Sequence, residues 1–374
     1  MNRRIMSELL DEHLRSVNVY FDRESEFPKG RGPLKTYIVE AHAPDGGCLE
    51  DGNASDVLNH ISKNAGLRVS RTDDKNLYDV RSDRAGFFFD LLDPRFWIVH
   101  TMSNVDVAEE ILTVLVNTYP FLDYAWPSAE LMRAIQTTGK SLGFTIDFDE
   151  TRLSSPSAAE EELLHDPDAI VKIRFGGTGA EALVHKLNEV VPNAMAFAMV
   201  KFSRDDSNTG SYIISELNQS GRLKAAGNSV NLHLQTVSEL LHGYKSFITA
   251  IEQVAKIHTR ETGELVGNPI VLEFPTPLRD FNGFVKALVS CREPLKLWGL
   301  VNPIREDFVQ IDGVDLHSGS RLRMDVATTY LRIYLGPSSC GNTVARLLRN
   351  LQAHISAVVT LNLPEPEPVS TLSE

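Results

Sequence analysis

Alternating hydrophobic and polar positions, followed by helical periodicity, recur three times along this chain. The copy nearest the C-terminus begins with a strand at 269–274 and a helix at 279–290. Four further strands are predicted near 295–302, 306–312, 320–326 and 329–335. A helix with a hydrophobic face follows, made of Val344, Leu347, Leu348, Leu351 and Ile355. The pattern therefore predicts the order strand, helix, four strands, helix.

Two earlier segments repeat this order. In the first, a strand at 36–41 precedes a helix near 55–63, four strands, and a helix at 105–117. In the second, a strand at 169–175 and a helix at 178–190 precede four short strands and a long helix, which opens with the capping box Thr236-Val-Ser-Glu239. Strand starts near 36, 169 and 268 predict an internal repeat.

The predicted fold class is α+β, with three tandem β-α-β-β-β-β-α repeats and antiparallel sheets that carry helices on one face. This element order resembles the half-repeat of the TATA-binding-protein fold. The resemblance implies curved sheets with two helices on the convex side and binding on the concave side. We predict these parts: an N-terminal helix and loop (1–34), the first repeat with an extra helix and strand (35–150), an acidic linker (151–168), the second repeat (169–260), the third repeat (268–360) and a disordered tail (361–374).

Composition places the chain among globular proteins. Its 374 residues are 42% hydrophobic and 23% charged, and no run approaches the roughly 18 apolar residues that span a bilayer. Three widely separated cysteines indicate a reducing compartment. We therefore expect a cytoplasmic protein that does not enter a membrane.

Charge is distributed unevenly. The net charge is −13, and residues 36–118 hold 14 acids and 7 bases. Segments 169–258 and 268–359 are mildly basic. The overall balance argues against a protein that coats nucleic acid, although the basic C-terminal half could bind a polyanion locally.

One predicted hairpin, 320–326 with 329–335, carries a candidate binding face. Its alternation directs Leu322, Met324, Leu331 and Ile333 toward the helices. The opposite face then presents Arg321, Arg323, Tyr330, Arg332 and Tyr334. A turn at Ala327 and Thr328 would pair Arg323 with Arg332, Arg321 with Tyr334, and Asp325 with Tyr330. Facing arginines indicate an anion or an acidic partner, and a solvated sheet face is the alternative interpretation.

A glycine-rich turn is the second candidate. Gly176, Gly177, Thr178 and Gly179 follow a strand and open a helix, as in loops that hold phosphate. No lysine follows the glycines, and antiparallel strands come next, so a tight strand-to-helix turn is the competing interpretation.

Catalytic motifs are not recognised in the sequence. His42 and His100 lie near acidic residues and could meet as a metal site, but neither has the spacing of a known ligand motif. We expect no cofactor and assign no catalytic or metal-binding residue. The sequence favours a non-enzymatic scaffold subunit that binds protein partners through its sheet faces. A nucleic-acid-binding protein that uses the arginine hairpin is the first alternative, and a metal-dependent hydrolase or nuclease is the second.

Overall fold

The computed structural model describes residues 2–18, 32–42, 53–149, 170–177, 179–190, 194–259 and 265–363. They form two compact units, one combining Met1–Phe148 with Val171–Lys245 and the other combining Asp149–Ile170 with Ser246–Glu374. Among the described residues, no helix is long and apolar enough to cross a membrane. The predicted acidic linker at 151–168 lies outside the described residues.

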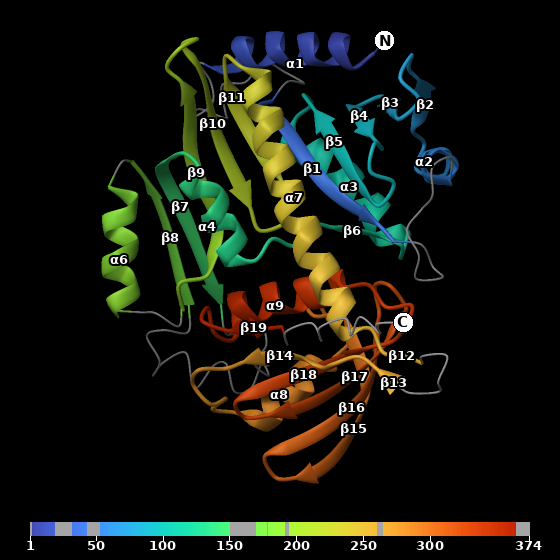
Figure 1. The fold of residues 1–374 in the computed structure, drawn as a ribbon, viewed down its shortest axis with the longest axis vertical. Helices are drawn as coiled ribbons and strands as arrows, with labels where there is room; N and C mark the ends of the chain where they lie inside the picture. Colours follow the sequence, from blue (N-terminus) through green and yellow to red (C-terminus); the bar gives the residue numbers. More distant parts are fainter. Residues whose placement is uncertain are drawn as a thin grey trace, which may run out of the picture. The chain divides into compact units, whose positions relative to one another are not determined.

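The first unit holds most of the first predicted repeat and the second one as far as Lys245 (Figure 1). Its helices are α1 (Arg3–Val17), α2 (Asn53–Asn64), α3 (Val105–Thr118), α4 (Ala129–Thr137), α6 (Ala180–Val190) and the first part of α7 (Val230–Ala255). Its strands are β1 (Leu34–Ala41), β2 (Arg68–Arg71), β3 (Leu77–Arg81), β4 (Gly86–Asp90), β5 (Phe96–Thr101), β6 (Leu122–Tyr124), β7 (Lys140–Asp149), β8 (Ile170–Gly176), β9 (Phe197–Asp206), β10 (Ser211–Asn218) and β11 (Leu223–Gly227).

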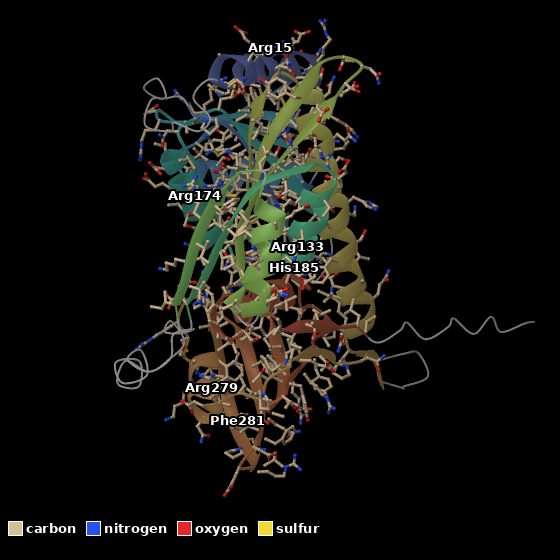
Figure 2. The ribbon with its side chains drawn as sticks, turned by 90° about the vertical axis from the view of Figure 1, so that its left-hand side faces the viewer. Arg15, Arg133, Arg174, His185, Arg279 and Phe281 are labelled. Carbon is tan, nitrogen blue, oxygen red and sulfur yellow. The ribbon has the colours of Figure 1, made fainter. Side chains whose placement is uncertain are left out.

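All these strands join one sheet in the order β2-β3-β4-β5-β1-β11-β10-β9-β7-β8, and β6 also pairs with β1. Strand β1 is central and pairs antiparallel with β5, β6 and β11. Every residue of β1 is buried. Strand β8 is at the sheet edge and alternates between exposed and half-buried residues, with Arg174 projecting from it (Figure 2).

This sheet carries helices on both faces around β4, and not on one face as the sequence predicts. Phe87 and Phe89 pack in one hydrophobic cluster with residues of α2 and α3. Phe88 lies in a second cluster with Leu10 and Leu14 of α1. Adjacent strand residues point to opposite faces, so three consecutive phenylalanines require apolar cover on both sides.

The second unit holds the third predicted repeat. Its elements are the end of α7, β12 (His258–Thr259), β13 (Leu265–Val266), β14 (Ile270–Glu273), α8 (Phe281–Leu288), β15 (Leu297–Arg305), β16 (Phe308–Asp315), β17 (Arg321–Ala327), β18 (Tyr330–Leu335), α9 (Asn342–His354) and β19 (Thr360–Asn362). Phe281, labelled in Figure 2, is the first residue of α8. The preceding Asp280 caps this helix by accepting a hydrogen bond from the Gly283 amide at 2.8 Å.

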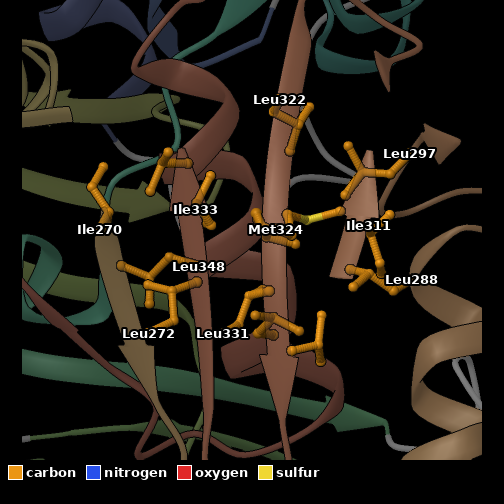
Figure 3. Packing of buried hydrophobic residues seen from close by; sticks show 14 of the residues in the cluster. Ile270, Leu272, Leu288, Leu297, Ile311, Leu322, Met324, Leu331, Ile333 and Leu348 are labelled. Atoms are coloured by element: carbon orange, nitrogen blue, oxygen red, sulfur yellow. The ribbon is translucent and has the colours of Figure 1, made fainter. Parts of the chain in front are cut away.

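Six strands of this unit form an antiparallel sheet in the order β15-β16-β17-β18-β14-β19. One face packs into a hydrophobic core that includes Leu272, Met324, Ile333 and Leu348 (Figure 3). Strand β17 alternates between the core and the opposite face up to Met324. Strand β15 has exposed residues over most of its length and forms one sheet edge.

The α+β class with antiparallel sheets is confirmed. The elements of the first and third segments also share one strand order, since β2-β3-β4-β5-β1 corresponds to β15-β16-β17-β18-β14. The tandem repeat itself and the resemblance to the TATA-binding-protein fold stay predictions.

Three details of the sequence analysis are wrong. Between α6 and α7, the described residues of the second segment form three strands, β9, β10 and β11, where the sequence predicts four. Helix α7 begins at Val230, whose amide donates to Asp11, so Thr236 lies inside the helix and its hydroxyl donates to the Leu232 carbonyl. Thr360–Asn362 pairs with β14, so the ordered part of the chain extends past the predicted boundary at 360, and residues from 364 onward lie outside the described part.

Candidate functional site

The predicted β17–β18 hairpin has the inward and outward faces that its alternation indicates. Leu322, Met324, Leu331 and Ile333 are buried in the core of the second unit. Arg321, Arg323 and Arg332 are exposed, and Tyr330 and Tyr334 are half-buried. The structure therefore brings all five candidate binding residues to one face of the sheet.

The register of this hairpin differs from the prediction. Arg323 lies opposite Tyr334, and Asp325 lies opposite Arg332. The two-residue connection is Thr328–Thr329, one position later than expected. A shift of the turn by one residue moves every cross-strand partner by two positions, which keeps the faces but changes the pairs. The predicted opposition of Arg323 and Arg332 is therefore wrong.

The observed pairs balance charge across the strands. Tyr334 donates its hydroxyl hydrogen to the Asp325 carboxylate at 3.0 Å, and the Arg332 guanidinium lies 4.6 Å from the Tyr330 ring centroid. Arg323 also lies opposite Asp312 of β16. Burial, followed by the hydrogen bond to Asp325, raises the pKa of Tyr334. Arg323 and Arg332 thus each have an acidic and an aromatic neighbour, whereas Arg321 lies opposite Val314.

The same face continues onto β16 and β15, where sequence reasoning missed two residues. Trp298 lies opposite Val314, which pairs with Arg321, and Leu300 lies opposite Asp312, which pairs with Arg323. Trp298 is 44% exposed and Leu300 is 65% exposed. Their signal in the sequence is the uncharged run from Leu297 to Ile304, placed between Lys296 and Arg305. We name this surface the open face and define it by Trp298, Leu300, Arg321, Arg323, Tyr330, Arg332 and Tyr334.

The glycine-rich turn adopts the geometry of a tight strand-to-helix connection. Gly177 has φ +139°, a backbone conformation that favours glycine, and its amide donates to the Leu142 carbonyl at 2.7 Å. Gly176 ends β8, Gly179 precedes α6, and Thr178 lies outside the described residues. The Gly177 amide is already used within the fold, so it is not available to a phosphate.

The two histidines of the predicted metal alternative do not meet. His100 pairs with Thr36, and His42 lies six residues further along the same chain as Thr36, which is about 20 Å in an extended strand. His100 Nδ1 lies 2.8 Å from the Thr36 hydroxyl, and His233 Nε2 lies 2.7 Å from that same oxygen. Burial lowers the pKa of His100 to about 4 and that of His233 to about 3, so both rings are neutral at pH 7.

A lysine is buried on the other face of β1. Lys35 is 0% exposed, and its ammonium group donates to the Pro33 carbonyl at 2.6 Å. Burial lowers the pKa of Lys35 to about 7, and the nearby Arg222 guanidinium lowers it further while Glu109 opposes the change. The pKa of Lys35 therefore lies near neutral pH, where an amine can act as a base, but the side chain is enclosed by protein.

The second unit contains a buried ion pair. Asp315 is 0% exposed, accepts a hydrogen bond from the Thr343 hydroxyl at 2.6 Å, and pairs with Arg346 at 2.5 Å. Burial alone would raise the pKa of Asp315, but Arg346 and the hydrogen bonds from Thr343 and the His317 amide together lower it. The pair joins the end of β16 to α9 and has the character of a structural contact.

A pocket of about 340 Å³ lies between α1 and the strands of the first sheet. Glu12, His13 and Ser16 line one side, and Asp79 and Arg81 lie among the residues of the other. This volume is within the usual range of small-molecule sites. Arg81 already donates to Asp79 at 3.1 Å, and His13 Nε2 lies 2.7 Å from the Gly32 carbonyl oxygen.

Comparison with known proteins places the whole chain in one family. The protein MJECL33 of Methanocaldococcus jannaschii is 26% identical over 396 residues, which covers 94% of this chain and 91% of the relative. The family model described as MJECL33-like protein matches residues 1–367. The chain therefore belongs to the MJECL33-like protein family.

Proposed function

We propose that this protein is a non-enzymatic scaffold subunit, and that it binds a partner protein through the open face of its second unit. The observation that carries this proposal is the exposure of Trp298 and Leu300 beside a row of arginines and tyrosines. The proposed cytoplasmic location follows from the cysteine content of the sequence.

The residue types support a protein partner. Tryptophan, tyrosine and arginine are the side chains most enriched among residues that dominate protein interfaces. On this face, Trp298 offers a large apolar surface, and Arg332 is already stacked on Tyr330. A stacked guanidinium loses little conformational freedom when a partner binds, because its position is held before association.

The charge pattern favours protein over nucleic acid as the partner. Asp325 lies opposite Arg332, and Asp312 lies opposite Arg323. Phosphate binding depends on cations that neutralise successive phosphates, and interleaved carboxylates oppose that. A protein surface with its own mixed charges can match such a pattern.

The test is a comparative capture experiment. The tagged chain and its Trp298→Ala and Arg323→Ala variants are incubated with nuclease-treated lysate from native cells, and captured proteins are quantified by mass spectrometry. A captured protein is then purified and its Kd measured by calorimetry. We expect each variant to lose about 2 kcal/mol of binding free energy, or roughly thirtyfold in Kd.

Val114→Ala is the matched control. Val114 is 52% exposed on α3 of the first unit, so its substitution removes an exposed apolar side chain that is not part of the open face. A partner whose Kd is unchanged by both open-face variants would contradict the proposal. Capture of nucleic acid in untreated lysate, lost with rising salt and with Arg323→Ala, would support the nucleic-acid alternative instead.

A further inference from the structure

Among the described residues, no strand pairs with the outer edge of β15, so this strand presents backbone groups that have no sheet partner. The Leu316 amide donates to the Lys296 carbonyl at 2.8 Å, which makes 296 and 316 a hydrogen-bonded pair. The same register pairs Trp298 with Val314 and Leu300 with Asp312. In an antiparallel ladder, hydrogen-bonded and non-hydrogen-bonded pairs alternate. Residues 297, 299, 301 and 303 therefore direct their backbone groups away from β16.

These outward groups form a distinctive pattern. Gly299 and Val301 each offer an amide hydrogen and a carbonyl oxygen at the sheet edge. Pro303 offers only a carbonyl, because proline has no amide hydrogen. The Leu297 carbonyl already accepts a hydrogen bond from the Cys291 amide at 3.0 Å. This edge therefore has no hydrogen-bond donor at Pro303 and no free acceptor at Leu297.

We infer that β15 pairs antiparallel with β15 of a second copy of this chain, with the two Leu300 residues facing each other at the twofold axis. In this register, Gly299 of each copy exchanges two backbone hydrogen bonds with Val301 of the other. Pro303 of one copy faces Leu297 of the other. The missing donor of Pro303 therefore meets a carbonyl that is already bonded, and no backbone group loses a partner.

Neighbouring registers match less well. Pairing centred on Val301 places Pro303 opposite Gly299 and leaves the Gly299 carbonyl without a donor. Pairing centred on Gly299 places Val301 opposite Leu297, whose carbonyl is occupied by Cys291. Each alternative leaves backbone groups unpaired inside the new sheet, which costs free energy. The hydrogen-bond pattern thus selects the register centred on Leu300.

Side chains agree with the same register. Leu300, 65% exposed in the single chain, would pack against Leu300 of the other copy, and Trp298 would lie opposite Asn302 of the other copy. No charged residue occurs from Leu297 to Ile304, so no like charges oppose each other within the paired segment. Edge strands that stay monomeric usually carry charges that prevent such pairing. The paired strands would join two six-stranded sheets and place their open faces in one assembly.

The test measures self-association of the full chain without any partner. Sedimentation equilibrium over about 1 to 200 μM is expected to show a monomer–dimer equilibrium with a micromolar Kd, as suits a short strand interface. Leu300→Lys places two ammonium groups directly opposite each other and is expected to weaken the dimer at least about tenfold. The control Val114→Lys, on α3, is expected to leave the dimer unchanged.

Cysteine cross-linking tests the register. On a background in which Cys48 and Cys291 are serine, Leu300→Cys places two thiols at a non-hydrogen-bonded pair, where Cα atoms are about 4.5 Å apart and a disulfide fits. Val301→Cys places them diagonally at about 7 to 8 Å, too far for efficient bonding. We expect a covalent dimer only from Leu300→Cys.

A monomer at every concentration, or a dimer that Leu300→Lys does not weaken, would overturn the inference. Equal cross-linking of the two cysteine variants would overturn the register. Because no partner protein is present, these results are independent of the capture experiment on the open face.

Discussion

Acid is expected to destabilise the first unit through two buried histidines. His100 and His233 share the Thr36 hydroxyl and are buried between β1, β5 and α7. Burial lowers the pKa of His100 to about 4 and that of His233 to about 3, from an ordinary value of 6.5. Asp90 raises the pKa of His100, Arg3 lowers it, and His100 in turn lowers that of His233. Both rings therefore gain protons more readily after unfolding.

The sign and size of the effect follow from proton linkage. Between pH 6.5 and 4 the unfolded chain binds more protons at these sites than the folded chain, so the free energy of unfolding falls as pH falls. Their contribution is fully present above pH 6.5. From pH 7 to pH 4.5, each histidine lowers the free energy of unfolding by about 2 to 3 kcal/mol, and the two together lower it by about 5 kcal/mol. This is a large part of the roughly 5 to 15 kcal/mol that stabilises a typical domain.

Urea unfolding at pH 7, 5.5 and 4.5 measures this effect. A Trp298→Phe background leaves Trp97 and Trp126, both in the first unit, as the fluorescent reporters. The comparison is with the double variant His100→Gln and His233→Gln, whose amides do not titrate. The variant is expected to be less stable at pH 7 but to lose about 5 kcal/mol less than the parent between pH 7 and 4.5.

Both proteins carry the same carboxylates, so the pH dependence that carboxylates contribute cancels in the comparison. Equal loss of unfolding free energy in parent and variant would refute the reasoning, because it would mean that the two histidines have ordinary pKa values in the folded protein.

Two further predictions concern buried charges. Asp315→Ala leaves Arg346 buried without its carboxylate, and we expect the unfolding free energy of the second unit to fall by about 3 to 5 kcal/mol. Urea unfolding measures this with Trp298 as the only fluorescent tryptophan, on a Trp97→Phe and Trp126→Phe background, and a loss under about 1 kcal/mol would contradict the prediction. Lys35→Met removes a group whose pKa falls from 10.5 to about 7 on folding, so we expect a gain of up to about 5 kcal/mol near pH 7 that declines as pH rises toward 10.5. Thermal unfolding at pH 7 and 10 checks the sign, and an equal gain at both values would show that the charge of Lys35 is not the cause.

Local patterns were sufficient to place most elements. The hairpin β17–β18 was predicted with the correct inward residues, since Leu322 and Met324 alternate with Arg321 and Arg323 and strand residues face alternate sides. Its register was not predictable in the same way. Turns at Ala327–Thr328 and Thr328–Thr329 contain no glycine or asparagine to mark the bend, and both keep the same faces.

Exposure was the part of the candidate site that sequence could not supply. Trp298 and Leu300 are large apolar residues in a predicted strand, and such residues are normally buried. Only the position of β15 at the edge of the sheet leaves them uncovered. In the same way, α1 is recognisable as an amphipathic helix, but its contact with Phe88 on the second face of the first sheet depends on residues far apart in the chain.

The sequence by itself determined the α+β class, the order of the elements and the side of each strand that faces a core, because these depend on periodicities within a few residues. The tertiary structure alone decided which strands became neighbours, where α7 begins, how the arginines pair and which edge remains open. Those features depend on contacts between distant segments, whose free energies are comparable with the local preferences that they override. The pairing of Asp325 with Arg332 and the open edge of β15 are therefore properties of the fold and not of any local pattern.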